Sequence, residues 1–168
     1  TGNKTAKWTA SGALMLLPAL AQAQEISGAD TAWIMMSTAL VLFMTIPGLS
    51  LFYGGLVRTR NVLSVLMQCF AITCVASLVW LLVGYSLAFG ASNGGIIGGF
   101  EFFGFNNVGA EPNAAYAATI PHLSFAAYQM MFAIITPALI TGAFVERVRF
   151  KTFLIFSVLW ATLVYDPV

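Results

Sequence analysis

Four long apolar runs, separated by short polar segments, dominate the chain beyond residue 29. They extend over about Asp30–Val57, Val62–Phe89 and Pro121–Val145, and from Thr152 to the end. A helix needs about 20 residues to cross the hydrocarbon core of a bilayer, and each run is near or above that length. The runs show no alternation of period two, which argues against a membrane barrel. The pattern predicts an all-α integral membrane protein with four transmembrane helices.

Composition supports a membrane protein and narrows the choice of partners. The 168 residues are 60% hydrophobic and only 8% charged, whereas soluble domains have about a quarter of their residues charged. The formal net charge is +1, which gives no reason to expect nucleic acid or an acidic macromolecule as a partner. The lipid bilayer is therefore the first partner that the sequence predicts.

The first 23 residues have the pattern of a secretory signal peptide. Lys4 and Lys7 precede the apolar run Ala10–Ala21, and Ala21-Gln22-Ala23 supplies the small residues that a signal peptidase reads. The run is too short to span the bilayer. We expect cleavage after Ala23, which leaves residues 24–168 as the membrane domain. The alternative is an uncleaved anchor.

Basic residues predict the orientation of the helices. Arg58 and Arg60 lie between the first two runs, and Arg147, Arg149 and Lys151 lie between the third and the fourth. The segments that flank the other ends of the runs carry none. Basic loops stay on the cytoplasmic side, so both of these loops are expected inside and the mature N-terminus outside. This orientation agrees with a cleaved signal peptide.

The segment of about residues 90–118 joins the second and third runs on the expected outer side. It is rich in glycine, asparagine and aromatic residues, as in Phe102-Phe103-Gly104-Phe105. Aromatic rings favour the level of the lipid headgroups. We therefore expect a structured extracellular loop.

Few ionisable groups lie at membrane depth. No paired carboxylates, Ser/His/Asp set or Cys/His dyad can be assembled, so we do not expect an enzyme. A single histidine offers no metal site, and no cofactor is expected. His122 is interpreted as an interfacial residue that caps the start of the third helix. Asp166 is either a functional carboxylate or a solvated helix end.

Aromatic and amide side chains remain as candidates for a binding site. Tyr128 and Phe132 are four residues apart, so they lie on one face of the third helix, and Gln129 is adjacent to that face. Such a pair is commonly a packing contact. The functional alternative is a constriction lined by rings, whose faces attract small cations.

Several segments resemble bacterial ammonium transporters of the Amt/Mep/Rh family. Residues 38–58 read TALVLFMTIPGLSLFYGGLVR and are followed by Asn61-Val-Leu-Ser64. Gly84–Phe89, Phe132–Ile140 and Gly142–Arg147 extend the likeness. Trp160 to Pro167 continues it to the end of the chain.

The resemblance implies the architecture and partners of the whole protein. Members of this family are homotrimers of eleven-helix protomers in the cytoplasmic membrane, and each pore runs between two inverted five-helix halves. The chain would then be the N-terminal portion of a bacterial Amt protein, holding four of the eleven helices. Ammonium, or its analogue methylammonium, would be the substrate, and a PII-type signal protein could bind regions that lie outside this sequence.

The resemblance also implies roles for individual residues. Phe132 matches the inner of two stacked gate rings, and Tyr128 matches an aromatic position at the outer recruitment site. Leu49, Phe52 and Tyr53 match first-helix positions that line or flank the pore. Gln129 is taken as a further pore-lining residue, whereas His122 matches neither of the two lumen histidines of the family.

A mechanism follows from the two lines of reasoning together. Ammonium and potassium are nearly equal in size, so a size filter cannot separate them. Only ammonium can release a proton and cross a dry, apolar lumen as a neutral molecule, because a bare ion there is heavily penalised. Ammonium transport is the leading hypothesis, an ammonium sensor is the second, and a four-helix membrane scaffold is the third.

Overall fold

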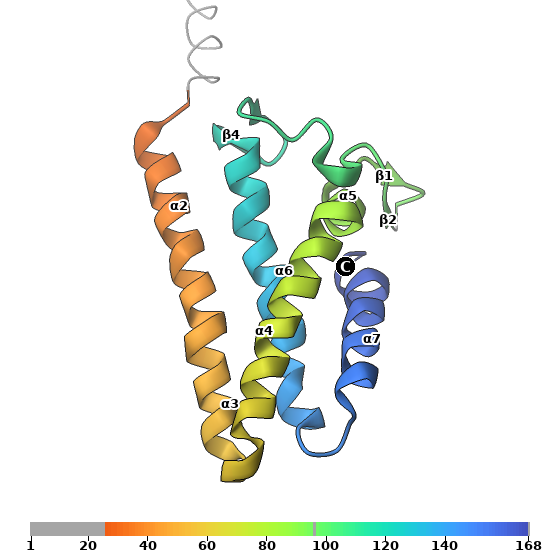
Figure 1. Ribbon diagram of the computed structural model, residues 1–168. Helices are drawn as coiled ribbons and strands as arrows, with labels where there is room; N and C mark the ends of the chain where they lie inside the picture. The colour runs from red at the N-terminus through yellow and green to blue at the C-terminus, as the bar shows by residue number, and fades with distance from the viewer. Residues whose placement is uncertain (1–25, 96, 168) are drawn as a thin grey trace, which may run out of the picture.

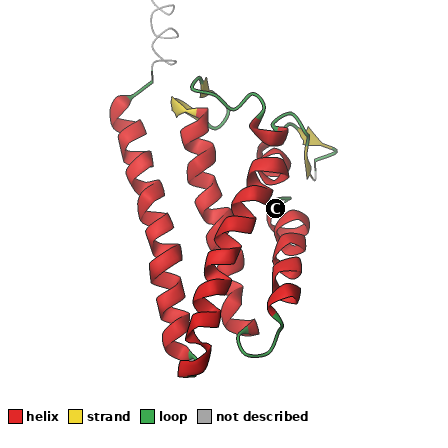
Figure 2. Cartoon of the chain, viewed as in Figure 1, coloured by secondary structure: helices red, strands yellow, loops and turns green. Residues whose placement is uncertain are grey.

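The structure is a computed structural model that describes residues 26–95 and 97–167. The expected signal peptide at residues 1–23 lies outside this part. The described chain is mostly helical, with four short strands at one end (Figures 1 and 2). The helical elements are α2 (Gly28–Phe43), η2 (Met44–Leu49), α3 (Ser50–Leu56), η3 (Thr59–Asn61), α4 (Val62–Val79), η4 (Trp80–Gly84), α5 (Tyr85–Phe89), η5 (Phe103–Phe105), α6 (His122–Phe144), α7 (Phe150–Trp160) and η6 (Ala161–Tyr165).

Three helical stretches are long and apolar enough to cross a membrane. They are Gly28–Leu56 with 29 residues, Thr59–Phe89 with 31 and His122–Phe144 with 23. These match the first three predicted spans. The fourth run forms the apolar helix Phe150–Tyr165, which is shorter than the length that a perpendicular crossing requires. A fourth span therefore stays a prediction.

Pro47 lies inside the first stretch, and the helix continues past it. Proline lacks a backbone donor, and its ring clashes with the carbonyl four residues earlier. Here the backbone widens into the π-helical turn η2, and buried hydroxyls bond carbonyls of the same region. Thr45 Oγ1 donates to Val41 O at 3.0 Å, and Ser50 Oγ donates to Ile46 O. The chain thus crosses the Pro-Gly break as one continuous helix.

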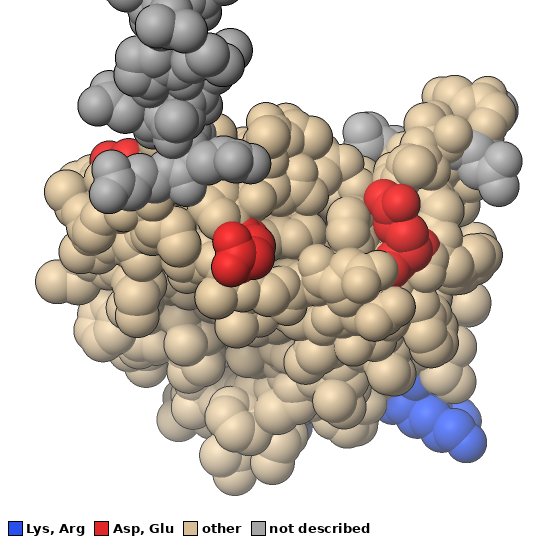
Figure 3. Space-filling model, turned by 90° about the horizontal axis from the view of Figure 1, so that it is seen from above, with Lys and Arg blue, Asp and Glu red and all other residues tan. Residues whose placement is uncertain are grey.

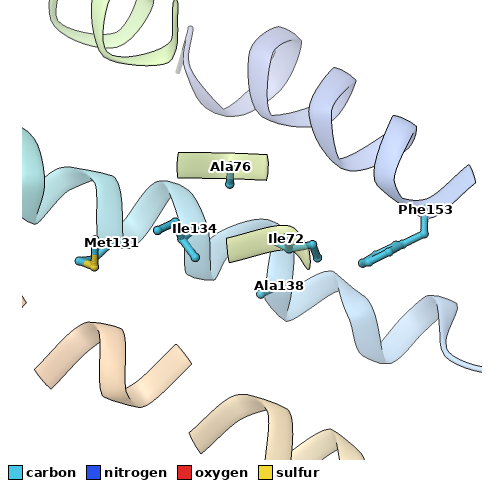
Figure 4. Packing of buried hydrophobic residues seen from close by; sticks show 6 residues of the cluster. All are labelled: Ile72, Ala76, Met131, Ile134, Ala138 and Phe153. Atoms are coloured by element: carbon cyan, nitrogen blue, oxygen red, sulfur yellow. The ribbon is translucent and has the colours of Figure 1, made fainter. Parts of the chain in front are cut away.

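The buried core lies where α4 meets α6 and α7. Ile72 and Ala76 of α4 pack with Ile134 of α6, and the ring of Phe153 of α7 closes the group (Figure 4). The cluster also includes Met131 and Ala138 of α6. Helix α2 packs on α6 from the other side of the bundle (Figure 1). These contacts fix α6, the helix that carries three of the six predicted site residues.

The predicted outer loop is a folded segment. It contains the antiparallel pairs β1 (Ser92–Asn93) with β2 (Ile97–Gly98), and β3 (Pro112–Asn113) with β4 (Ala117–Pro121). Ser86 anchors the segment to α5, because its Oγ donates to Gly99 O at 2.7 Å and accepts from Phe102 N at 3.1 Å.

The two ends of the bundle differ in charge. The turns after α3 and after α6 lie together at the end opposite the strands (Figure 1). These turns and the start of α7 carry the basic residues of the described chain. Figure 3 looks onto the end with the strands, where scattered acidic side chains lie in a largely uncharged surface and basic side chains show only at one margin. The fold thus gathers both basic turns at one end.

A close contact between α3 and α6 gives a test of this packing. Tyr53 Oη donates to Leu139 O at 2.7 Å, and its ring lies against Gly142. An alanine Cβ at position 142 would lie 2.6 Å from Tyr53 Cε1.

We expect Gly142→Ala to destabilise the protein by about 1–3 kcal/mol, because the tethered ring cannot move aside without losing its hydrogen bond. Thermal unfolding in detergent measures the effect. Gly55→Ala is the control, since nothing lies within 4 Å of the added methyl group there. Equal melting temperatures of the two variants would contradict the proposed contact.

Candidate functional site

Tyr128 and Phe132 form an aromatic pair on α6. Their ring centroids are 5.1 Å apart and their planes are inclined by 81°, an edge-to-face contact. Both side chains are half-buried. The opposite side of α6 is held in the core by Ala126, Ala133 and Ile134, so the two rings stand on a fixed support. The predicted sharing of one helix face is observed.

Gln129 lines a cavity of about 480 Å³ between α6 and the ends of two other helical stretches. Trp80 and Phe89 come from the second stretch, and Trp160 and Tyr165 come from the fourth. Ala88, Val164, Asp166 and Pro167 complete the wall. The cavity therefore combines aromatic faces with an amide and a carboxylate, groups that suit a small cation rather than an anion.

Asp166 belongs to this wall but is not a solvated helix end. Its side chain is only 3% exposed, and its Oδ2 has no hydrogen-bond partner in the described part of the chain. The carboxylate lies against Gly84, where an added Cβ would be 3.0 Å from Asp166 Oδ2 and 3.0 Å from Trp80 Cε3. Glycine at position 84 thus makes room for a carboxylate beside an indole ring.

His122 lies inside an aromatic cluster and does not cap α6. Its side chain is 3% exposed, and a hydrogen bond of 2.5 Å joins its Nε2 to Tyr85 Oη. The rings of Phe89, Phe102 and Phe105 surround Tyr85. The sequence interpretation of an interfacial cap was wrong, because 36 residues separate the two partners and no local pattern links them.

The three predicted pore positions of the first stretch lie apart from the aromatic pair. Leu49 packs against the core cluster of α4, α6 and α7. Tyr53 donates a hydrogen bond to Leu139 O, and its ring packs against Gly142. Phe52 is 60% exposed. The described chain therefore brings together Tyr128 and Phe132, with Gln129 next to them in sequence. The contacts observed for Leu49 and Tyr53 are with other residues, and Phe52 is exposed.

No group of three His, Cys, Asp or Glu side chains within residues 26–95 and 97–167 is placed to hold a metal ion. Polar groups next to the aromatic pair along α6 include the amide of Gln129 and the hydroxyl of Thr136, which donates to Phe132 O at 2.6 Å. The arrangement can bind and orient a small cation by ring faces and neutral acceptors.

Comparison with known proteins identifies the family. Residues 32–168 match the Ammonium Transporter Family. The ammonium transporter of Bacillus subtilis is 52% identical over 139 residues, which cover 83% of this chain and 34% of the relative. The ammonium transporter of Mycobacterium tuberculosis (strain H37Rv) is 46% identical over 155 residues, covering 84% of this chain and 32% of the relative.

Solved structures give the same result. The crystal structure of Saccharomyces cerevisiae Mep2 matches with a TM-score of 0.72 and 39% identity, over 84% of this chain and 33% of that one. A structure named Sensor Amt Protein matches with a TM-score of 0.72 and 26% identity, over 82% of this chain and 32% of that one. The chain spans about a third of the length of these relatives. On its sequence and its fold alike, the chain belongs to the ammonium transporter family.

Proposed function

We propose that the protein carrying this chain transports ammonium across the cytoplasmic membrane. The observation that carries the proposal is the match of residues 32–168 to the family, together with the edge-to-face pair of Tyr128 and Phe132 on α6. In this proposal the chain supplies four of eleven transmembrane helices of a homotrimeric transporter, after a signal peptide at residues 1–23. A PII-type regulator would bind parts outside this sequence.

The orientation proposed for the chain places the basic turns in the cytoplasm. The four arginines of these turns line one cavity at the same end of the bundle: Arg58, Arg60, Arg147 and Arg149. The positive-inside rule makes this the cytoplasmic end, and the strands and the start of α2 are then external.

The proposed mechanism uses the aromatic pair at the outer part of the pathway. Tyr128 contributes to the site that recruits ammonium, because ring faces attract a cation by about 2 kcal/mol or more once water is removed. Phe132 follows one turn deeper, where its ring contacts the cation as water is removed and blocks hydrated ions. Ammonium returns its proton to water on the outer side at this point, and neutral ammonia crosses the apolar lumen beyond it. Gln129, Leu49, Phe52 and Tyr53 are proposed to line or flank the pathway.

An ammonium sensor is the second candidate, and the match to a structure named Sensor Amt Protein favours keeping it. A sensor would use the same outer site without net uptake, and would carry a fused or docked signalling domain. The higher identity to proteins named ammonium transporters favours transport.

Replacement of Phe132 tests the gate. We expect Phe132→Ala in the full-length protein to lower uptake of labelled methylammonium by about tenfold or more, because the ring contact with the desolvated cation is lost. The control is Phe70→Ala, which removes a ring that is 55% exposed on α4, away from the pair. Wild-type uptake by Phe132→Ala would remove the gate assignment.

Uptake of labelled rubidium, an analogue of potassium, tests the release of the proton. The protein should give no rubidium uptake above that of cells that lack it, since rubidium and potassium have no neutral form that can enter an apolar lumen. A pathway that selects by charge and size alone would instead carry rubidium. The measurement is the initial uptake rate at constant membrane potential.

Single cysteines test the orientation in a background with Cys69→Ser and Cys74→Ser. Gly109→Cys in the outer segment should react with a membrane-impermeant maleimide in intact cells. Lys151→Cys, at the start of α7 next to the second basic turn, should react only after permeabilisation. The reverse labelling pattern would overturn the proposed topology.

A further inference from the structure

A second cavity of about 480 Å³ lies at the basic end of the bundle, far from the aromatic pair. Its walls come from the turn after α3, the first turns of α4 and the turn after α6. The lining residues are Arg58, Arg60, Asn61, Ser64, Val65, Gln68, Val145, Glu146, Arg147, Val148 and Arg149. Four arginines against one glutamate leave three positive charges in excess at this wall.

The two turns that hold these arginines are joined to each other. Glu146 Oε1 accepts from Asn61 Nδ2 at 2.6 Å and from Arg58 N at 3.3 Å. Helix α6 ends at Phe144, and Glu146 lies in the turn that follows, with a backbone φ of 64°. These hydrogen bonds, with smaller contributions from the charges of Arg58 and Arg60, lower the pKa of Glu146.

The carboxylate of Glu146 therefore accepts its two hydrogen bonds from amide N–H groups. Among residues 26–95 and 97–167, no guanidinium is a hydrogen-bond partner of this carboxylate, and the charges of Arg58 and Arg60 act on it from a distance. The planar donor forks of Arg58, Arg60, Arg147 and Arg149 are thus available to an anion, and guanidinium is the side chain that fits a phosphate group by paired hydrogen bonds.

The buried side-chain amide of Gln68 at the inner wall of this cavity favours a ligand that can donate a hydrogen bond. Gln68 is only 6% exposed, and its Oε1 has no hydrogen-bond partner in the described chain. An unpaired buried acceptor is costly, and a ligand with a hydroxyl donor can satisfy it after rotation of the terminal amide. Ser64, one turn before Gln68 on α4, supplies a further hydroxyl to the same wall.

We propose that this cavity binds a phosphate group that carries a hydroxyl donor. The phosphate oxygens meet the arginines, and the hydroxyl meets Gln68. Two sources share this chemistry: the glycerol phosphodiester headgroup of an anionic lipid in the adjacent leaflet, and free inorganic phosphate. The site does not depend on ammonium transport, because it shares no residue with the aromatic pair or with the cavity that Gln129 lines.

Native mass spectrometry of the full-length protein in detergent tests the proposal. The probes are phosphatidylglycerol, phosphatidylmethanol, phosphatidylethanolamine and inorganic phosphate, each added alone. We expect binding of phosphatidylglycerol, weakened by about tenfold or more in the double variant Arg60→Gln and Arg149→Gln. Lys151→Gln is the control, since this exposed residue carries the same charge at the start of α7 but does not line the cavity.

Two further variants separate the parts of the site. Arg60→Lys with Arg149→Lys keeps the charge but loses the donor forks, so binding should be intermediate. Gln68→Leu should weaken phosphatidylglycerol but leave phosphatidylmethanol, an anionic phosphodiester without a hydroxyl donor, little changed. Binding of inorganic phosphate alone, with the same dependence on the arginines, would support the site with the soluble anion as its ligand.

Three results would overturn the proposal. The first is an equal loss of binding in Lys151→Gln and in the double arginine variant, which would mean that any basic residue at this end suffices. The second is equal binding of phosphatidylethanolamine, which carries no net charge. The third is no binding of any probe by a wild-type protein with an unchanged melting temperature.

Discussion

Every backbone amide in the apolar stretches has to find a partner within the protein, because hydrocarbon offers none. This constraint explains why the three long stretches are continuous helices even where their sequences contain helix breakers. At Pro47 the helix widens into a π turn, and the hydroxyls of Thr45 and Ser50 bond to carbonyls of the same region. Similar π turns occur at η4 and η6. The backbone hydrogen bonds thus stay continuous, while the helix departs locally from α geometry.

The same constraint makes each buried polar side chain in the bundle informative. Tyr85 and His122 satisfy each other inside a cluster of rings, and Trp80 Nε1 donates to Ala126 O. Asp166 and Gln68 lack such partners in the described chain, and each lies at the wall of a cavity. The first cavity joins aromatic faces to a carboxylate, and the second joins arginines to an amide. The two ends of the bundle therefore suit ligands of opposite charge, a cation at the cavity with Asp166 and an anion at the cavity with the arginines.

The sequence was sufficient for what depends on local pattern. Hydropathy located the three long helices within a few residues, and the spacing of Tyr128 and Phe132 placed both rings on one face of α6. Contacts between distant segments were not predictable in this way. The pairing of His122 with Tyr85 has no periodic signal, and the burial of Asp166 depends on the absence of a side chain at Gly84, on another helix.

The bond between Asn61 and Glu146 makes two positions, 85 residues apart in the chain, mutually dependent. Aspartate has nearly the shape of asparagine, yet at position 61 it would set two carboxylates within hydrogen-bond distance of each other. A substitution that is conservative by shape is therefore harmful unless position 146 also loses its charge. Natural variation at these two sites should consequently show epistasis, with acidic residues avoided at both sites together.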